Sequence, residues 1–381
     1  MKTLVPGFAT EEATKAYVQK HAALIAKENY SDFSKSKIKL SSLGVGTFGG
    51  NPDEVVDAQI GQTVSQALQN GINVIDTAAH YRYGRSLAAI RAGLLDAISQ
   101  GVSRDEIFLA SKGGFLTFRG GLPENIDEWF DKEIVDNRLG VKEDLANKAH
   151  LLTPEYINYQ IDLSRQMMGV ETLDTFLVDQ PEIHIPVIGK EALNQKLLAV
   201  FTLLEKAVSE NRIRSYGIST FNGMRVETDE SLFQSITSML GLAEKAARLA
   251  TGKDITPHHF KVIQLPFNMV MTEGFTRFNQ ATGEGNVCST LQAAYQLGVY
   301  IMSSHALMKG HLASQTIEEV KASMQNLTNF AQYALQFARS TPGIGSALVG
   351  LSQQKHLQDV IAVAQQPPLS KQAYLSLYQK T

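Results

Sequence analysis

Short apolar runs rich in β-branched residues alternate along the chain with longer segments in which apolar residues recur at helical spacing. Between the first two runs, Val56, Ile60, Val64 and Leu68 lie four residues apart and predict one buried helix face. Such alternation is typical of a parallel sheet with crossover helices, so the predicted class is α/β. The predicted strands end near Gly46, Asp76, Lys112, Asp179, Ser219, Gln264, Ser303 and Gly350.

Eight strand-helix units predict a (β/α)8 TIM barrel. The alternative, a doubly wound sheet with a second domain, would require a linker or a change of composition near the middle of the chain, and the sequence has neither. We therefore predict a single domain over residues 1–381. It would comprise a helical N-terminal extension over 1–36, a barrel over about 37–365 and a tail over 366–381.

Two long stretches follow predicted strands three and five. Residues 113–150 are polar and carry the single tryptophan, Trp129, whereas residues 222–260 include an apolar helix expected from Ser231 to Ala250. Long loops at the carboxyl ends of barrel strands are candidate substrate walls, and the 113–150 stretch is expected to form one together with Phe48, Phe115 and Phe267. For the second stretch a purely structural role is an equal alternative.

Composition narrows the function classes. The 381 residues carry 35 Lys and Arg against 38 Asp and Glu, a balance that argues against a nucleic-acid partner. No stretch has the roughly 20 uninterrupted apolar residues of a membrane crossing, and the N-terminus lacks the apolar core of a signal peptide. The single cysteine, Cys288, excludes an internal disulfide and a multi-thiolate metal site, and it lies in a segment of helical pattern where a buried, unreactive role is expected. We expect a cytoplasmic protein whose partner is a small molecule, with its oligomeric state open.

Gly44, Gly46 and Gly49 form a G-x-G-x-x-G pattern after a strand, which raises the possibility of a Rossmann dinucleotide site. Two features argue against it. Asp76 follows the third glycine by 27 positions where about 20 is expected, and a proline follows where the first helical turn should already run. The glycines are better explained by a tight turn that lines a substrate site.

One run, GINVIDTAAHYRYGRS, places an acid at a strand end and a tyrosine on the loop that follows. Asp76 ends predicted strand two, Tyr81 follows it, and Lys112 ends strand three, so the three side chains are expected to meet at the barrel mouth. A phenol with a pKa of about 10 is a poor acid unless a nearby cation stabilises its phenolate. Lys112 would supply that charge and Asp76 would hold the ammonium group, which makes Tyr81 a candidate proton donor. Each residue alone is typical of a surface or packing position, and the combination is what indicates chemistry.

With these residues in place, the sequence resembles the aldo-keto reductase superfamily from about residue 37 to 363. The resemblance is carried by the order and spacing of LGVGTFGG, GINVIDTAAHYRYGRS, LASKGG, LTPEYINYQIDLSRQMMGVETLDTFLVDQPE, IRSYGIST, VIQLPFN, IMSSHALMKGHL and STPGIGSALVGLSQQKHLQD. It implies a barrel enzyme of a larger-loop, bacterial-type branch that reduces carbonyl groups with NADPH or NADH and without a metal. It also implies that Tyr81 donates the proton, with Lys112 and Asp76 in support.

The chain departs from the family pattern at one position. The family has a histidine at the end of strand four, in an L-H-x-P-E context, where this chain reads LVDQPE and has Asp179. An ionised aspartate only accepts hydrogen bonds and would repel the negative charge that develops on a carbonyl oxygen. Either burial and Asp76 keep Asp179 protonated, or His80, His184 or His305 supplies the donor. A branch of the superfamily with a carboxylic acid at this position reduces activated C=C bonds, so an enone substrate is a further possibility.

The resemblance places the cofactor at the carboxyl ends of the strands, with its phosphates in the loops after strands seven and eight. NADP(H) is favoured and NAD(H) is possible, because members that strongly prefer NADPH have Lys or Arg where this chain has Ser352 and His356, and only Lys355 offers a full charge. An equal explanation of the serine–glutamine run that begins at Ser352 is that it simply caps the N-terminus of the last helix. The implied cofactor-binding residues are Gly46, Thr47, Asp76, Ser219, Gln264, Ser304, His305, Leu307, Lys309, Gly310, Gly350, Ser352, His356 and Asp359.

Two other function classes are alternatives. A low-turnover accessory protein that binds the nucleotide as a sensor is supported by Asp179, while the retention of Tyr81, Lys112 and Asp76 argues against it. A metal-dependent hydrolase would require a cluster of histidines and carboxylates at strand ends, and the nine histidines do not form one in the sequence.

Overall fold

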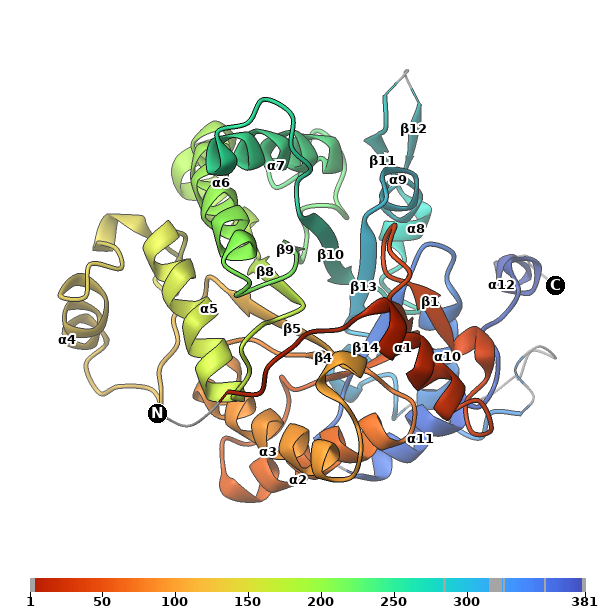
Figure 1. The fold of residues 1–381 in the computed structure, drawn as a ribbon. Helices are drawn as coiled ribbons and strands as arrows, with labels where there is room; N and C mark the ends of the chain where they lie inside the picture. The colour runs from red at the N-terminus through yellow and green to blue at the C-terminus, as the bar shows by residue number, and fades with distance from the viewer. Residues whose placement is uncertain (1–3, 284–285, 315–323, 325, 353, 379–381) are drawn as a thin grey trace.

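The computed structural model shows a closed barrel of parallel strands surrounded by helices (Figure 1). It describes residues 4–283, 286–314, 324, 326–352 and 354–378. The last barrel strand pairs with the first, so the predicted TIM barrel is confirmed and the open, doubly wound alternative is wrong. The barrel strands are β3 (Leu43–Gly46), β4 (Val74–Asp76), β5 (Phe108–Gly113), β8 (Thr175–Asp179), β9 (Tyr216–Ser219), β10 (Phe260–Pro266), β13 (Tyr300–Ser304) and β14 (Ser346–Gly350).

A helix follows each barrel strand and packs on the outside. Ile60, Val64 and Leu68 are fully buried on the inner face of the first of these helices, as their spacing predicts. Asp53 caps that helix, because its side chain accepts a hydrogen bond from the Val56 N–H. The crossover helices are α2 (Glu54–Gln69), α3 (Arg85–Ser99), α5 (Pro154–Met168), α6 (Ile185–Ser209), α7 (Ile236–Thr251), α9 (Thr290–Leu297), α10 (Phe330–Ser340) and α11 (Gln354–Ala364).

The N-terminal extension is helical only in part. After α1 (Glu11–Lys20), the strands β1 (Tyr30–Asp32) and β2 (Lys39–Ser41) form an antiparallel hairpin that was not predicted, because these mostly polar segments contain no apolar run. Phe33 in this hairpin lies with its ring centroid 4.8 Å from that of Phe108 and 5.2 Å from that of Tyr300. The hairpin therefore covers the amino ends of the barrel strands, opposite the end where the predicted site residues lie.

The stretch after β5 forms a small subdomain at the side of the barrel, seen around α4 in Figure 1. It contains α4 (Ile126–Phe130) and a hairpin of β6 (Leu145–Ala146) and β7 (His150–Leu151). Phe130, Ile134 and Leu151 form its own apolar core with Tyr156 of α5. Through this core the subdomain packs against α5.

The stretch after β9 is the ordinary crossover to β10. Its helix α7 begins at Ile236, later than the expected Ser231, because Ser235 caps it by accepting a hydrogen bond from the Ser238 N–H.

An excursion that was not predicted follows β10 and projects from the barrel in Figure 1; it comprises α8 (Glu273–Thr276), β11 (Phe278–Ala281) and β12 (Val287–Ser289). Cys288 lies buried on β12, so its predicted place within a helix is wrong.

The last helix among the described residues is short, α12 (Lys371–Ser376). Within the described ranges, no helix combines the length and the apolar character that a bilayer crossing needs.

Candidate active site

A cavity of about 1200 Å³ opens at the carboxyl ends of the barrel strands. Asp76, Tyr81 and Asp179 line it, as do all the residues that the sequence resemblance assigns to the cofactor. Lys112 lies beneath the wall and is fully buried. The structure thus brings together residues that are spread over most of the chain, from Gly46 to Asp359.

A buried ion pair forms the floor of this cavity. The Lys112 ammonium group donates to both carboxylate oxygens of Asp76, at 2.8 and 2.7 Å, and to the Thr77 carbonyl oxygen at 2.8 Å. Gln264 Nε2 donates to Asp76 Oδ1 at 3.0 Å. Burial acts to lower the pKa of Lys112, but Asp76, Tyr81 and Asp179 together outweigh it, so the net pKa is raised. Lys112 therefore remains a fixed positive charge at neutral pH.

Tyr81 lies directly over this charge, with Lys112 Nζ 4.9 Å from its ring centroid. Burial raises the pKa of the Tyr81 phenol above its usual range, while Lys112 acts in the opposite direction. From the sequence, we expected Lys112 to make the phenol more acidic; in the structure, desolvation of the phenolate outweighs that attraction. Tyr81 consequently keeps its proton at neutral pH until a reacting group accepts it.

The turn that carries Tyr81 is held by the start of α2. In η2 (Tyr81–Gly84), Arg82 and Tyr83 adopt left-handed backbone angles with φ of 51° and 58°. The Arg82 guanidinium forms an ion pair with Asp57 at 2.7 Å and donates from Nε to the Asn51 carbonyl oxygen at 3.0 Å. This anchor was not predicted, because nothing in a polar run marks one arginine as buried.

Asp179 lies at the end of β8 beside the same lysine. Burial raises the pKa of Asp179 to about 6, although Lys112 opposes the shift. Its carbonyl oxygen lies 2.6 Å from Nε2 of His150, a residue of the subdomain after β5 that the sequence analysis did not single out. Gln180, also missed, adopts a left-handed conformation, lines the cavity and donates its N–H to the Ser219 carbonyl oxygen at 2.6 Å.

The three histidines considered as substitute donors lie in different places. His184 contacts His150 at 2.9 Å between Nε2 and Nδ1 and is outside the cavity wall, whereas His80 and His305 line the cavity. The His80 ring centroid lies 4.8 Å from that of Tyr81, and its Nδ1 has no hydrogen-bond partner in the part of the chain that the structure describes. Burial, assisted by Lys112, lowers the pKa of His80 to about 3. A neutral His80 still carries one ring N–H and can donate it.

The outer part of the cavity fits a long anionic ligand. Lys309 and Lys355 supply positive charge there, whereas burial and Lys355 lower the pKa of His356, which leaves it neutral. Gly50 has a φ of +95°, and a Cβ on it would lie 2.6 Å from Val56 and 3.3 Å from Ser352. The loops after β3 and β14 can approach this closely only because that position is glycine.

Asp359 lines the same part of the cavity and joins two helices. Its Oδ1 accepts hydrogen bonds from Asn329 Nδ2 at 2.7 Å and Gln332 Nε2 at 2.8 Å. Asn329 is the N-cap of α10, so these contacts link α11 to the start of α10.

The expected substrate walls are correct only in part. Phe48 lines the cavity with its ring centroid 5.1 Å from that of Tyr81, and Phe115 contacts His80 with the centroids 4.9 Å apart. Phe267 is instead buried and stacks on Phe337, and no described residue of 113–150 lines this cavity. The prediction for that stretch fails because its own core holds it against α5.

Across the described ranges, no group of three or more histidine, cysteine or carboxylate side chains is placed to hold a metal ion.

Two curated proteins are similar to this chain in sequence. It is 27% identical over 188 residues to the NADH-specific methylglyoxal reductase of Escherichia coli (strain K12), a match that covers 47% of this chain and 48% of that protein. It is 26% identical over 151 residues to the aldo-keto reductase YhdN of Bacillus subtilis (strain 168), covering 37% of this chain and 40% of that protein. The chain therefore aligns with about half of each relative or less.

Solved structures share the fold over nearly the full length. The aldo-keto reductase AKR11C1 from Bacillus halodurans, in its holo form, matches with a TM-score of 0.59 and 14% identity, covering 91% of this chain and 94% of that one. An aldo/keto reductase from Klebsiella pneumoniae in complex with NADP and acetate matches with a TM-score of 0.56 and 16% identity, covering 92% of this chain and 94% of that one. The model of the aldo/keto reductase family itself matches residues 42–380. This chain belongs to the aldo/keto reductase family.

Proposed function

We propose that this protein is an NAD(P)H-dependent oxidoreductase that reduces the carbonyl group of a small organic substrate. The observation that carries this proposal is the position of Tyr81 over the buried Lys112–Asp76 pair at the mouth of the barrel cavity. The cavity fits a nicotinamide dinucleotide by its volume, by its polar lining at the strand ends and by the two lysines on its outer part.

Each residue of the site has a distinct role in this reaction. A bound nicotinamide supplies the hydride. Tyr81 gives its proton to the substrate oxygen, so that a carbonyl becomes an alcohol, and the Lys112 ammonium group stabilises the phenolate left behind. Asp76 fixes Lys112 in position through two hydrogen bonds. Ser219 and Gln264 lie at the cavity floor, where their polar side chains can orient a carboxamide.

A second hydrogen-bond donor to the substrate oxygen is needed, because the family histidine is replaced by Asp179. With a pKa of about 6, only about a tenth of Asp179 is protonated at pH 7. His80 is neutral throughout this range and lies beside Tyr81, so it is the better donor for carbonyl reduction at neutral pH. The raised pKa of Asp179 favours one alternative, an enone-type C=C reductase that works best in mild acid.

The pH dependence of kcat/KM separates these two roles. If Asp179 donates as the neutral acid, kcat/KM falls as pH rises through about 6, because the protonated form is lost. Asp179→Asn keeps an N–H donor at this position and is expected to abolish that fall. The exposed carboxylate variant Asp229→Asn is the matched control. An Asp179→Asn profile identical to that of the parent would remove Asp179 from the mechanism and leave His80 as the donor.

The substrate class is tested by single-turnover decay of nicotinamide absorbance with aldehydes, ketones and enones. The Escherichia coli relative is named a methylglyoxal reductase, which makes methylglyoxal the first compound to assay. Decay with carbonyl compounds supports the main proposal, and decay with enones alone supports the alternative. Tight nucleotide binding without decay for any compound would favour a nucleotide-sensing accessory protein.

NADP(H) is the favoured cofactor and NAD(H) is possible. The Klebsiella neighbour binds NADP and the Escherichia coli relative is NADH-specific, so both remain open. Lys355 is the charged residue nearest in sequence to Ser352 and His356, where a 2′-phosphate is expected. Lys355→Met is expected to weaken NADPH binding about fivefold and to leave NADH unchanged, as measured by fluorescence titration. An equal loss for both nucleotides would show that Lys355 contacts a group common to both, and no loss for either would exclude it from the site.

A further inference from the structure

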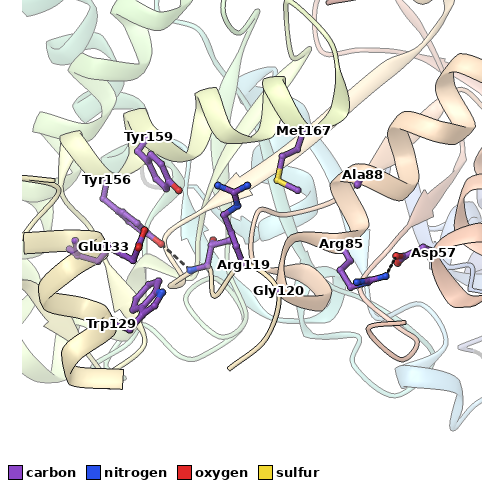
Figure 2. Close-up of a pocket in the computed structure, with 12 residues that line it drawn as sticks. Asp57, Arg85, Ala88, Arg119, Gly120, Trp129, Glu133, Tyr156, Tyr159 and Met167 are labelled. Carbon is purple, nitrogen blue, oxygen red and sulfur yellow. Dashed lines mark hydrogen bonds and ion pairs between the residues drawn. The ribbon is translucent and has the colours of Figure 1, made fainter. Parts of the chain in front are cut away.

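A second cavity of about 780 Å³ lies at the side of the barrel, between α3, α5 and the subdomain after β5 (Figure 2). Among the described residues, it shares no lining side chain with the cavity at the barrel mouth. Its wall includes two arginines, Arg85 and Arg119, and three aromatic residues, Trp129, Tyr156 and Tyr159. The proposed function uses none of these side chains.

One end of this cavity is aromatic. Trp129 packs on Phe118 with the ring centroids 4.6 Å apart, and Tyr156 stacks with Tyr159 at 6.1 Å. The Tyr156 hydroxyl is already engaged, because it donates to the Phe115 carbonyl oxygen and accepts from the Thr117 N–H, both at 3.1 Å. This end therefore offers ring surfaces to a planar group.

The middle of the cavity carries a cation without a partner. Figure 2 shows the Arg119 side chain extending into the space between Tyr159 and Met167. Its guanidinium group has no hydrogen bond or ion pair with any residue in the described ranges. The neighbouring carboxylate in the wall, Glu133, lies at the aromatic end beside Tyr156.

The opposite end is also positively charged. Arg85 lies 2.6 Å from Asp57, while its Nε is buried without a hydrogen-bond partner among the described residues. Asp57 also forms an ion pair with Arg82, at 2.7 Å between Oδ1 and Nη2. One carboxylate thus faces two guanidinium groups, and these three side chains together keep a net positive charge. Arginine pairs with carboxylate and phosphate groups through parallel N–H bonds, which suits it to a planar anion.

We propose that this cavity is a second ligand site, which binds a small planar aromatic anion. The ring lies against Trp129 and Tyr159, and its carboxylate or phosphate group is held by Arg119 with Arg85 behind it. The site borders the catalytic region, because the Gly120 N–H donates to the Tyr83 carbonyl oxygen at 3.3 Å, next to the turn that carries Tyr81. The proposal goes beyond the reductase function and does not depend on it.

The single tryptophan provides a direct test, because Trp129 is the only one in the chain and lies in the wall of this cavity. Tryptophan emission is followed while the full-length protein, without nucleotide, is titrated with benzoate, phenyl phosphate, benzyl alcohol and inorganic phosphate. We expect a saturable change with one or both aromatic anions, and weaker binding by about tenfold or more for benzyl alcohol and for inorganic phosphate. The comparison of benzoate with phenyl phosphate identifies the preferred anionic group.

Two arginine variants assign the binding to this cavity. Arg119→Met is expected to weaken the aromatic anion about tenfold, whereas Arg138→Met, a matched change at an exposed position of the same subdomain, is expected to leave it unchanged. The absence of a saturable change with either anion would overturn the proposal. Equal binding of benzyl alcohol or of inorganic phosphate, or unchanged binding in Arg119→Met, would overturn it as well.

Discussion

Replacing Tyr81 by phenylalanine is expected to lower kcat about a thousandfold while leaving the dissociation constant of NADPH nearly unchanged. The substitution removes the proton that Tyr81 holds at neutral pH and leaves its ring, with its contacts to Phe48 and His80, in place. Proton transfer by a positioned side chain contributes about 10²–10⁴-fold to a rate, which sets the expected size. Steady-state kinetics and fluorescence titration measure the two quantities.

Tyr83→Phe is the matched control for this change. Tyr83 lies two residues further along the same turn and does not line the barrel cavity, so its hydroxyl should be dispensable for turnover. A kcat for Tyr81→Phe close to that of the parent would contradict the assignment of Tyr81 as proton donor. Equal losses in both variants would point to a damaged turn instead.

Replacing Lys112 by methionine is expected to abolish most activity and to lower the free energy of unfolding by about 3–5 kcal/mol. The reason is that Asp76 would remain as a buried carboxylate whose main partner is gone. The double variant Lys112→Met/Asp76→Asn removes both charges and should recover part of the lost stability, because an amide is far less costly to bury than an unpaired charge. It should not recover activity, since no cation then faces Tyr81.

Urea unfolding of Lys112→Met, of Asp76→Asn and of the double variant tests this coupling. Losses that simply add in the double variant would show that the Lys112–Asp76 pair is not coupled as its geometry indicates. Recovery of turnover in the double variant would contradict the role of the Lys112 charge in stabilising the phenolate.

Much of the fold was predictable from local patterns. Each barrel strand is a compact apolar run that ends in a small or polar residue, and neighbouring strands of a barrel place their carboxyl ends on one rim. That rule alone placed Asp76, Tyr81 and Lys112 together. The hairpins β1–β2 and β11–β12 were missed because their strands mix polar with apolar residues and give no apolar run.

The electrostatics of the site needed the three-dimensional structure. The presence of Lys112 correctly indicated an influence that lowers the pKa of Tyr81, but only the burial of the phenol shows that the opposite influence is larger. The anchoring of the turn by Arg82 depends on an ion pair with Asp57 on a separate helix. The contact between His150 and the Asp179 backbone joins the subdomain after β5 to the end of barrel strand β8. Such long-range pairs leave no pattern in a single sequence.

The stretch over residues 113–150 shows how loop length alone can mislead. It follows β5 at the active end of the barrel, yet Phe130, Ile134 and Leu151 give it a core of its own that packs on α5. It lines the second cavity and not the barrel mouth.

The central claim is that hydride passes from a bound nicotinamide to a substrate carbonyl carbon while Tyr81 protonates the oxygen. Single-turnover reaction with NADPH and NADH deuterated at the transferring position, followed by mass analysis of the product, tests it most directly. The account predicts an alcohol that carries one deuterium on the former carbonyl carbon, formed by the parent protein and nearly absent with Tyr81→Phe. Tight binding of the nucleotide with no deuterium in any product would contradict it.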